Sequence, residues 1–170
     1  MMRWTARCLA MLLGLLNTAA PRAQTPAAEF SAPQRDYILA CAGCHGVHGV
    51  SNPDLVPSLL GLVGYFLDLP EGRAYLSRLP NVAFSTLSDE QLAEVLNYMV
   101  FEIGAGSAPA GARPYVAAQV GEWRKQPLTE VTLSSYRRQL VETLIHRYRA
   151  PVSLRGYGAT TASCAKPPNC

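Results

Sequence analysis

Two cysteines and a histidine stand together in the first half of the chain, where residues 41–45 have the sequence CAGCH. Cys-x-x-Cys-His is the attachment motif of c-type haem. Cys41 and Cys44 are spaced so that their thiols can add to the two vinyl groups of one porphyrin, and His45 follows directly to supply an axial nitrogen to the iron. The two residues between the cysteines are small, so the turn can lie against the macrocycle. The motif therefore predicts one covalently attached haem c with His45 as an iron ligand.

Two other uses of a Cys-x-x-Cys pair have the same spacing. One is a thioredoxin-like redox pair, and the other is half of a zinc site. Neither explains the histidine, and no second Cys-x-x-Cys follows in the sequence. Haem attachment is therefore the preferred interpretation of residues 41–45.

The N-terminus has the layout of a secretory signal peptide. The first seven residues contain Arg3 and Arg7 and no acidic residue. A short apolar run and then small residues follow. The apolar run is shorter than the roughly 20 residues that span a bilayer. We expect residues 1–23 to be removed by cleavage after Ala23, which leaves no membrane span and places the mature chain in the periplasm.

The last two cysteines, Cys164 and Cys170, enclose a short loop near the C-terminus. Unpaired thiols of an exported protein tend to be oxidised. No histidine or acidic residue stands nearby to complete a metal site, and Cys8 leaves with the signal peptide. We therefore predict a disulfide between Cys164 and Cys170.

Charge is distributed unevenly along the chain. Residues 24–112 hold three basic and nine acidic residues, whereas residues 113–155 hold eight basic and three acidic residues. This imbalance favours contact between the two halves, or between the second half and an acidic partner, and a solvated helix face is the alternative. The chain after residue 23 has 12 residues of each sign, so a nucleic-acid-binding protein is not supported.

Helix signals occur between residues 31 and 148. Ser31 and Gln34 form a capping-box pattern ahead of one helix, and Ser88 and Gln91 form another. The helix that follows Ser88 carries an apolar stripe that ends near Gly104. Further helices are expected over residues 71–79, 115–125 and 133–148.

These patterns predict an all-α protein with a helical domain around the haem over residues 24–104. Residues 105–114 are rich in glycine, alanine and proline and are predicted to form a linker. Residues 115–150 form an extension of about two helices, too short to fold alone, so we expect the extension to dock on the first domain. Residues 151–170 are predicted to be a tail.

The segment from residue 37 to residue 99 resembles the class I cytochrome c family. The matching stretches are CAGCH at residues 41–45, GVHG at 46–49, VPSLLG at 56–61 and LNY at 96–98. The resemblance implies a cytochrome c-like fold and electron transfer. It also implies that the carbonyl of Pro57 accepts a hydrogen bond from Nδ1 of His45, which fixes the tautomer of the ligand. Three leucines would pack on the haem ring: Leu59, Leu60 and Leu62.

The sequence departs from this family at the sixth iron ligand. Class I cytochromes usually place a methionine on the loop before the last helix, but residues 77–84 contain no Met, His or Lys, and Leu79 occupies the expected position. Two candidates lie elsewhere, Met99 in the apolar stripe and His146 in the extension, while His48 is expected to be solvated. The iron is therefore either closed by an unrecognised ligand or open to a small molecule.

The sequence as a whole predicts a periplasmic mono-haem c-type cytochrome that carries single electrons between redox partners, such as a dehydrogenase and a terminal acceptor. No catalytic residue is assigned. The alternative is a haem protein with an open distal site that binds a gas or acts as a peroxidase, for which Tyr75 and Arg78 are the polar candidates. Arginines of the extension are candidates to neutralise the haem propionates.

Overall fold

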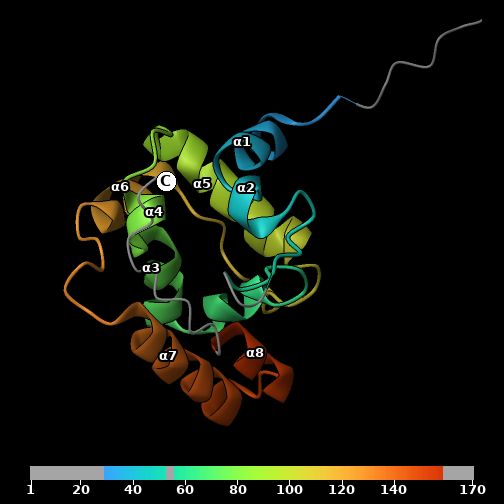
Figure 1. Ribbon diagram of the computed structural model, residues 1–170, viewed down its shortest axis with the longest axis vertical. Helices are drawn as coiled ribbons and strands as arrows, with labels where there is room; N and C mark the ends of the chain where they lie inside the picture. The colour runs from blue at the N-terminus through green and yellow to red at the C-terminus, as the bar shows by residue number, and fades with distance from the viewer. Residues whose placement is uncertain (1–28, 53–55, 159–170) are drawn as a thin grey trace, which may run out of the picture.

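The computed structural model describes residues 29–52 and 56–158 of the chain. These residues form an all-helical fold, and no β-strand occurs among them (Figure 1). The all-α prediction is therefore confirmed. The predicted signal peptide at residues 1–23 and the predicted Cys164–Cys170 disulfide lie outside the described residues. Within the described part of the chain, no helix has the length and apolar character needed to cross a membrane.

The motif at residues 41–45 follows the first helix without a break. Helix α1 (Ala32–Ala40) begins at Ser31, whose hydroxyl accepts a hydrogen bond from the backbone N–H of Gln34 at 3.4 Å. The chain turns at Cys41 into the short helix α2 (Ala42–His45). Tyr37 of α1 is fully buried and donates its hydroxyl to the carbonyl of Gly46 at 2.7 Å. The hydrophobic core thus holds the residue that directly follows the motif.

Three short helices follow the loop that contains Pro57: the 3₁₀ helix η1 (Val63–Asp68), α3 (Pro70–Arg78) and α4 (Pro80–Ala83). Helices α3 and α4 each start at a proline. Proline suits the first position of a helix because the N–H group that it lacks would have no partner there. The sequence did not predict α4, because four residues are too few to show a helical period.

Helix α5 (Asp89–Asn97) has both bonds of the predicted capping box. The Ser88 hydroxyl accepts from the Gln91 backbone N–H at 3.2 Å, and the Ser88 N–H donates to Oε1 of Gln91 at 3.0 Å. The chain continues as a π-helical segment, η2 (Tyr98–Ile103), which ends at Gly104 as predicted. Helix α1 packs across α5 and η2, and the rings of Tyr37 and Tyr98 lie 5.5 Å apart.

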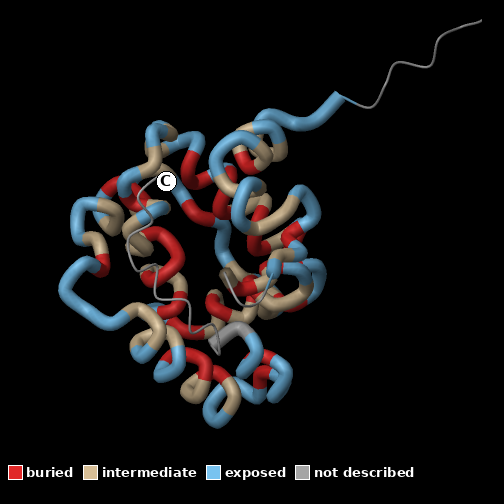
Figure 2. The backbone as a smooth tube through the Cα atoms, viewed as in Figure 1, coloured by how far each residue is buried: buried red, intermediate tan, exposed pale blue. Residues whose placement is uncertain are grey.

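The C-terminal half adds α6 (Ala117–Arg124), α7 (Leu133–Tyr148), η3 (Val152–Leu154) and α8 (Arg155–Gly158). Helix α6 packs on α3 and α5, and α7 packs on η1. Helices α7 and α8 lie side by side at the end of the molecule opposite α1 (Figure 1). Figure 2 shows buried residues on the inner sides of helices from both halves, and Val120, Leu144 and Leu154 belong to the same hydrophobic cluster as Tyr37 and Leu96.

Residues 105–114, the predicted linker, are anchored in the core at their start. The buried hydroxyl of Ser107 accepts from the backbone N–H of Gly64 at 2.9 Å and donates to the carbonyl of Gly104 at 2.6 Å. Position 64 requires glycine because a Cβ atom there would collide with Ser107 and Ala108. The segment therefore closes tightly over the contact between η1 and η2.

Candidate haem-attachment site

The turn at residues 41–45 presents the two thiols differently. Cys41 is half-buried and Cys44 is exposed, and neither thiol forms a disulfide. A Cβ atom added at Gly43 would meet no other atom within 4 Å, so the turn is open on that side. A bulky group bonded to both sulfurs could therefore lie against the turn beside Gly43 without displacing a neighbouring atom.

His45 is held in one orientation by a backbone carbonyl. Its Nδ1 lies 3.1 Å from the oxygen of Pro57, as the resemblance implied. A carbonyl oxygen can only accept, so Nδ1 carries the proton and Nε2 keeps the lone pair that a metal needs. Burial lowers the pKa of His45 and the charge of Arg137 lowers it further, although the bond to Pro57 opposes both. The imidazole is thus favoured in the neutral form that binds iron.

The carbonyl of Pro57 is itself fixed by the loop around it. The oxygen of Gly49 accepts from Ser58 Oγ at 2.9 Å and from the N–H of Leu59 at 2.7 Å. Gly49 has a φ of +74° and lies so close to Ile103 that a Cβ atom would collide with that side chain. Gly49 therefore sets the path of the loop that brings Pro57 to His45.

The two competing uses of the cysteines receive no support from the structure. Burial, followed by the nearby charge of Cys44, raises the pKa of Cys41 to about 11, whereas the attacking thiol of a redox pair requires a lowered pKa. Among the described residues, no three His, Cys, Asp or Glu side chains are grouped so that they could hold a metal ion. The donor set of two thiols and one neutral imidazole fits the chemistry of haem c.

The candidate sixth ligands from the sequence do not gather at one place. Met99 is 7% exposed and packs in the hydrophobic core, whereas the side chain of His146 is 70% exposed and its Nε2 lies 3.4 Å from Glu142. His48 is exposed, as expected. Leu79 is half-buried at the junction of α3 and α4.

The residues expected to surround the haem also differ in exposure. Leu59 is buried and Leu62 is half-buried, whereas Leu60 is 48% exposed. Arg78, a polar candidate for the distal side, donates from Nε to the carbonyl of Gln126 at 2.6 Å. Its guanidinium therefore serves to attach the extension to α3.

One contact between the extension and the first domain was missed by the sequence analysis. Arg137 of α7 donates from Nε to the hydroxyl of Tyr75 on α3 at 2.8 Å. Tyr75 is 1% exposed, and its charge-free form is favoured because burial raises its pKa more than Arg137 lowers it. Nothing in the sequence distinguished Arg137 from its neighbour Arg138, since both are arginines on the same predicted helix.

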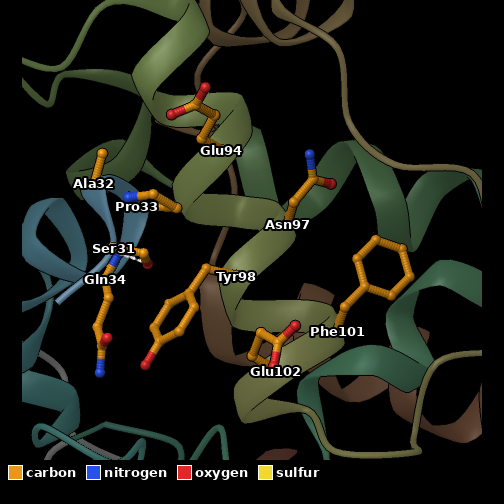
Figure 3. A pocket seen from close by; sticks show the side chains of 9 residues that line it. All are labelled: Ser31, Ala32, Pro33, Gln34, Glu94, Asn97, Tyr98, Phe101 and Glu102. Carbon is orange, nitrogen blue, oxygen red and sulfur yellow. Dashed lines mark hydrogen bonds between the residues drawn. The ribbon is translucent and has the colours of Figure 1, made fainter. Parts of the chain in front are cut away.

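A groove of about 670 Å³ lies elsewhere, where the start of α1 meets the outer side of α5 and η2. Figure 3 shows Glu94 and Asn97 of α5 on one side and Ser31 and Gln34 on the other. Asn97 is engaged at both ends of its amide by the backbone of Tyr115, at 2.6 and 3.0 Å. No cysteine or histidine lines the groove, so it is separate from the haem-attachment motif.

The all-helical fold, with a Cys-x-x-Cys-His turn whose histidine is oriented by a loop carbonyl, defines the class of c-type haem proteins. No family model matches the chain. Two curated relatives, both named cytochrome c-552 and both from Thermus thermophilus, are each 30% identical over 118 residues. These alignments span 59% of this chain and 90% and 80% of the two relatives. The chain belongs to the family of c-type cytochromes that contains them, and its cofactor is accordingly haem c.

Proposed function

We propose that this protein is a periplasmic mono-haem cytochrome that transfers single electrons between redox proteins. One haem would be attached covalently through Cys41 and Cys44, with His45 as the proximal ligand. The observation that carries the proposal is the 3.1 Å contact between His45 Nδ1 and the Pro57 carbonyl, since it leaves Nε2 for the iron. When bound, haem c supplies the one-electron chemistry, and the protein sets its orientation and environment.

The surface around the motif supports docking of a redox partner. Exposed apolar side chains occur at Val47, Val50 and Leu60, next to the exposed Cys44. The Leu60 N–H donates to Gly49 at 3.1 Å, which brings the two stretches together. Residues 42–52 and 56–62 contain no Lys, Arg, Asp or Glu. A partner would therefore meet a small surface whose described residues carry no Lys, Arg, Asp or Glu, as suits a contact that forms and dissociates quickly.

Covalent attachment is tested by producing the full chain in a host that matures c-type cytochromes. We expect the intact mass under denaturing conditions to exceed that of the polypeptide by one haem, and the polypeptide to begin after Ala23. A Cys41→Ala/Cys44→Ala double variant should lose this added mass. A wild-type protein that releases its haem on denaturation would refute covalent attachment.

Electron transfer is tested by cycling the purified holoprotein with a chemical reductant and oxidant. We expect a reversible change of one electron per chain, followed through the haem absorption. Irreversible bleaching, or no reduction at all, would contradict a carrier. Cell fractionation of the native host should recover the protein with the periplasmic contents, and its recovery in the cytoplasm would contradict the proposed location.

A second candidate function is a haem protein with an open sixth position. The favouring observation is that, among the described residues, Met99 packs in the core whereas His48 and His146 are both exposed to solvent. Carbon monoxide distinguishes the two candidates. A reduced spectrum that is indifferent to carbon monoxide supports a closed carrier, whereas rapid binding supports the open site.

A further inference from the structure

The outer side of α5 and η2 carries negative charge that no described residue balances. No lysine or arginine occurs between Arg78 and Arg113, whereas this span contains four acidic residues. One of the four, Asp89, pairs with Arg124 at 3.1 Å. The other three are exposed and form no ion pair among the described residues: Glu90, Glu94 and Glu102. This face is therefore available to a cation of another molecule.

Two of these carboxylates line the groove between α1 and the outer side of α5 and η2. Glu94 and Glu102 lie along the continuous helix that α5 and η2 form, with Tyr98 between them (Figure 3). The groove holds about 670 Å³, which leaves room for a long side chain. A guanidinium donates two parallel N–H groups to a carboxylate and also stacks on an aromatic ring. The groove therefore has the chemistry of an arginine-binding site.

The opposite end of the molecule, at α7, carries two exposed arginines (Figure 1). Residues 143–158 contain three arginines and no acidic residue. One of the three is paired with Glu142 at 3.0 Å, whereas Arg147 and Arg149 form no ion pair with a described residue. Tyr148 between them is 42% exposed. The end of α7 thus presents two guanidinium groups next to an exposed aromatic ring.

Arg149 occupies a backbone position that suits glycine better. It ends α7 with a φ of +59°, in the left-handed region that a side chain disfavours. His146 and Arg147 in the last turn already offset the negative end of the helix dipole, so Arg149 is not needed for that purpose. An arginine at a position that disfavours it indicates a use for the side chain, and no contact among the described residues accounts for one.

We propose that this protein associates head to tail, with Arg147 and Arg149 of one copy docked in the groove between Glu94 and Glu102 of the next. A second copy is the occupant because the two surfaces are complementary in charge. They lie at opposite ends of the molecule, so they cannot meet within one copy (Figure 1). A contact between two different surfaces leaves one of each kind unused, so further copies can add in an open chain or a ring. Neither surface includes residues 41–45, so the inference does not depend on the proposed function.

The test is sedimentation equilibrium of the full-length holoprotein over a range of protein concentrations. Salt screens exposed charges, so the average mass should rise with protein concentration at about 0.01 M salt and fall toward that of one copy at about 1 M salt. Two double variants, Glu94→Gln/Glu102→Gln and Arg147→Gln/Arg149→Gln, should each weaken association on the order of tenfold. An equal mixture of the two variants should recover association but stop at a dimer, because each retains one intact surface of a different kind.

The matched controls are Glu71→Gln/Glu130→Gln and Arg113→Gln/Arg138→Gln. They remove the same charges from exposed positions outside the two surfaces and should leave association unchanged. Arg149→Gly removes the charge where glycine is favoured, so it tests the contact even if the arginine double variant does not accumulate. A wild-type protein that stays monomeric at low salt would overturn the inference and leave both surfaces to other molecules. Equal losses in the controls, or a variant mixture that stays monomeric, would overturn it as well.

Discussion

The haem-attachment region, residues 41–62, and the C-terminal extension, residues 115–150, are held to one core by different kinds of contact. The attachment region is fixed by backbone groups and small residues, with glycines at its turns and no cation within it. The extension is fixed by long arginine side chains that reach carbonyl groups across the interface. Arg124 alone donates to Ala83 at 3.0 Å, Ser85 at 2.6 Å and Leu87 at 2.8 Å.

The difference reflects how far each region must reach. A turn that positions two thiols and a histidine needs fixed geometry over a few residues, which glycine and proline supply locally. A helical extension has to be attached after a segment of about ten residues, and a guanidinium can satisfy several carbonyl groups at once. Arg73 of the first domain reaches in turn toward the start of the extension. It donates to the carbonyls of Arg113 and Pro114 at 2.6 Å each and lies 4.2 Å from the Tyr115 ring centre.

Arg124→Ala should have the largest effect on stability. The side chain is 15% exposed, and it also pairs with Asp89 at 3.1 Å, so its loss leaves three carbonyls and a carboxylate without their donor. We expect the free energy of unfolding to fall by about 3 kcal/mol or more. Denaturant titration measures this, with Arg138→Ala as the exposed control. A loss below about 1 kcal/mol would contradict a main role for Arg124 in attaching the extension.

Gly49→Ala tests the attachment region in the same assay. The positive φ and the collision with Ile103 both disfavour a side chain, so the free energy of unfolding should fall by about 2 kcal/mol. Gly43→Ala is the matched control, because Gly43 lies in the helical turn α2 with open space beside it and should tolerate the methyl group. Equal losses in the two variants would contradict the view that the Pro57 loop depends on glycine at position 49.

Tyr37→Phe tests how much the buried hydrogen bond from Tyr37 to Gly46 stabilises the attachment region. The carbonyl of Gly46 loses its donor, and the free energy of unfolding should fall by about 1–2 kcal/mol near neutral pH. Burial raises the pKa of Tyr37 from 10.0 to about 12, so the folded state disfavours the phenolate. The stability that Tyr37 contributes is therefore present below pH 10 and is lost as the pH rises toward 12.

The check is the free energy of unfolding of wild type and Tyr37→Phe at two alkaline pH values, one on each side of pH 10. The gap between the two proteins should narrow at the higher pH. A gap that stays constant would mean that the Tyr37 hydroxyl is accessible enough to ionise normally.

The smallest effect is expected for His146→Ala. The side chain is exposed on α7 and contacts only Glu142 at 3.4 Å among the ion pairs of the described residues. Absorption spectra of both redox states should match those of wild type, as should those of His48→Ala. A change in the iron spectrum of His146→Ala alone would establish His146 as the sixth ligand and would require α7 to turn its exposed face toward the haem.

Features that depend on neighbouring residues were predictable from the sequence. The caps at Ser31 and Ser88, and the helix end at Gly104, follow from hydrogen bonds within one turn of helix. The partner of His45 was also within reach, because the resemblance placed Pro57 twelve residues away. Helix α4 and the burial of Ser107 were not predictable, since the first is too short for a period and the second depends on Gly64, 43 residues earlier.

The CAGCH motif by itself predicted where a haem would be attached and which residue would be an iron ligand. The reason is that thioether chemistry and the turn need only five consecutive residues. Only the tertiary structure decided which of the extension's arginines donates to Tyr75 and that Met99 belongs to the core. These facts depend on how α7 packs on η1 and α5 on α1, and no local pattern records the direction in which a side chain leaves a helix face relative to a distant segment.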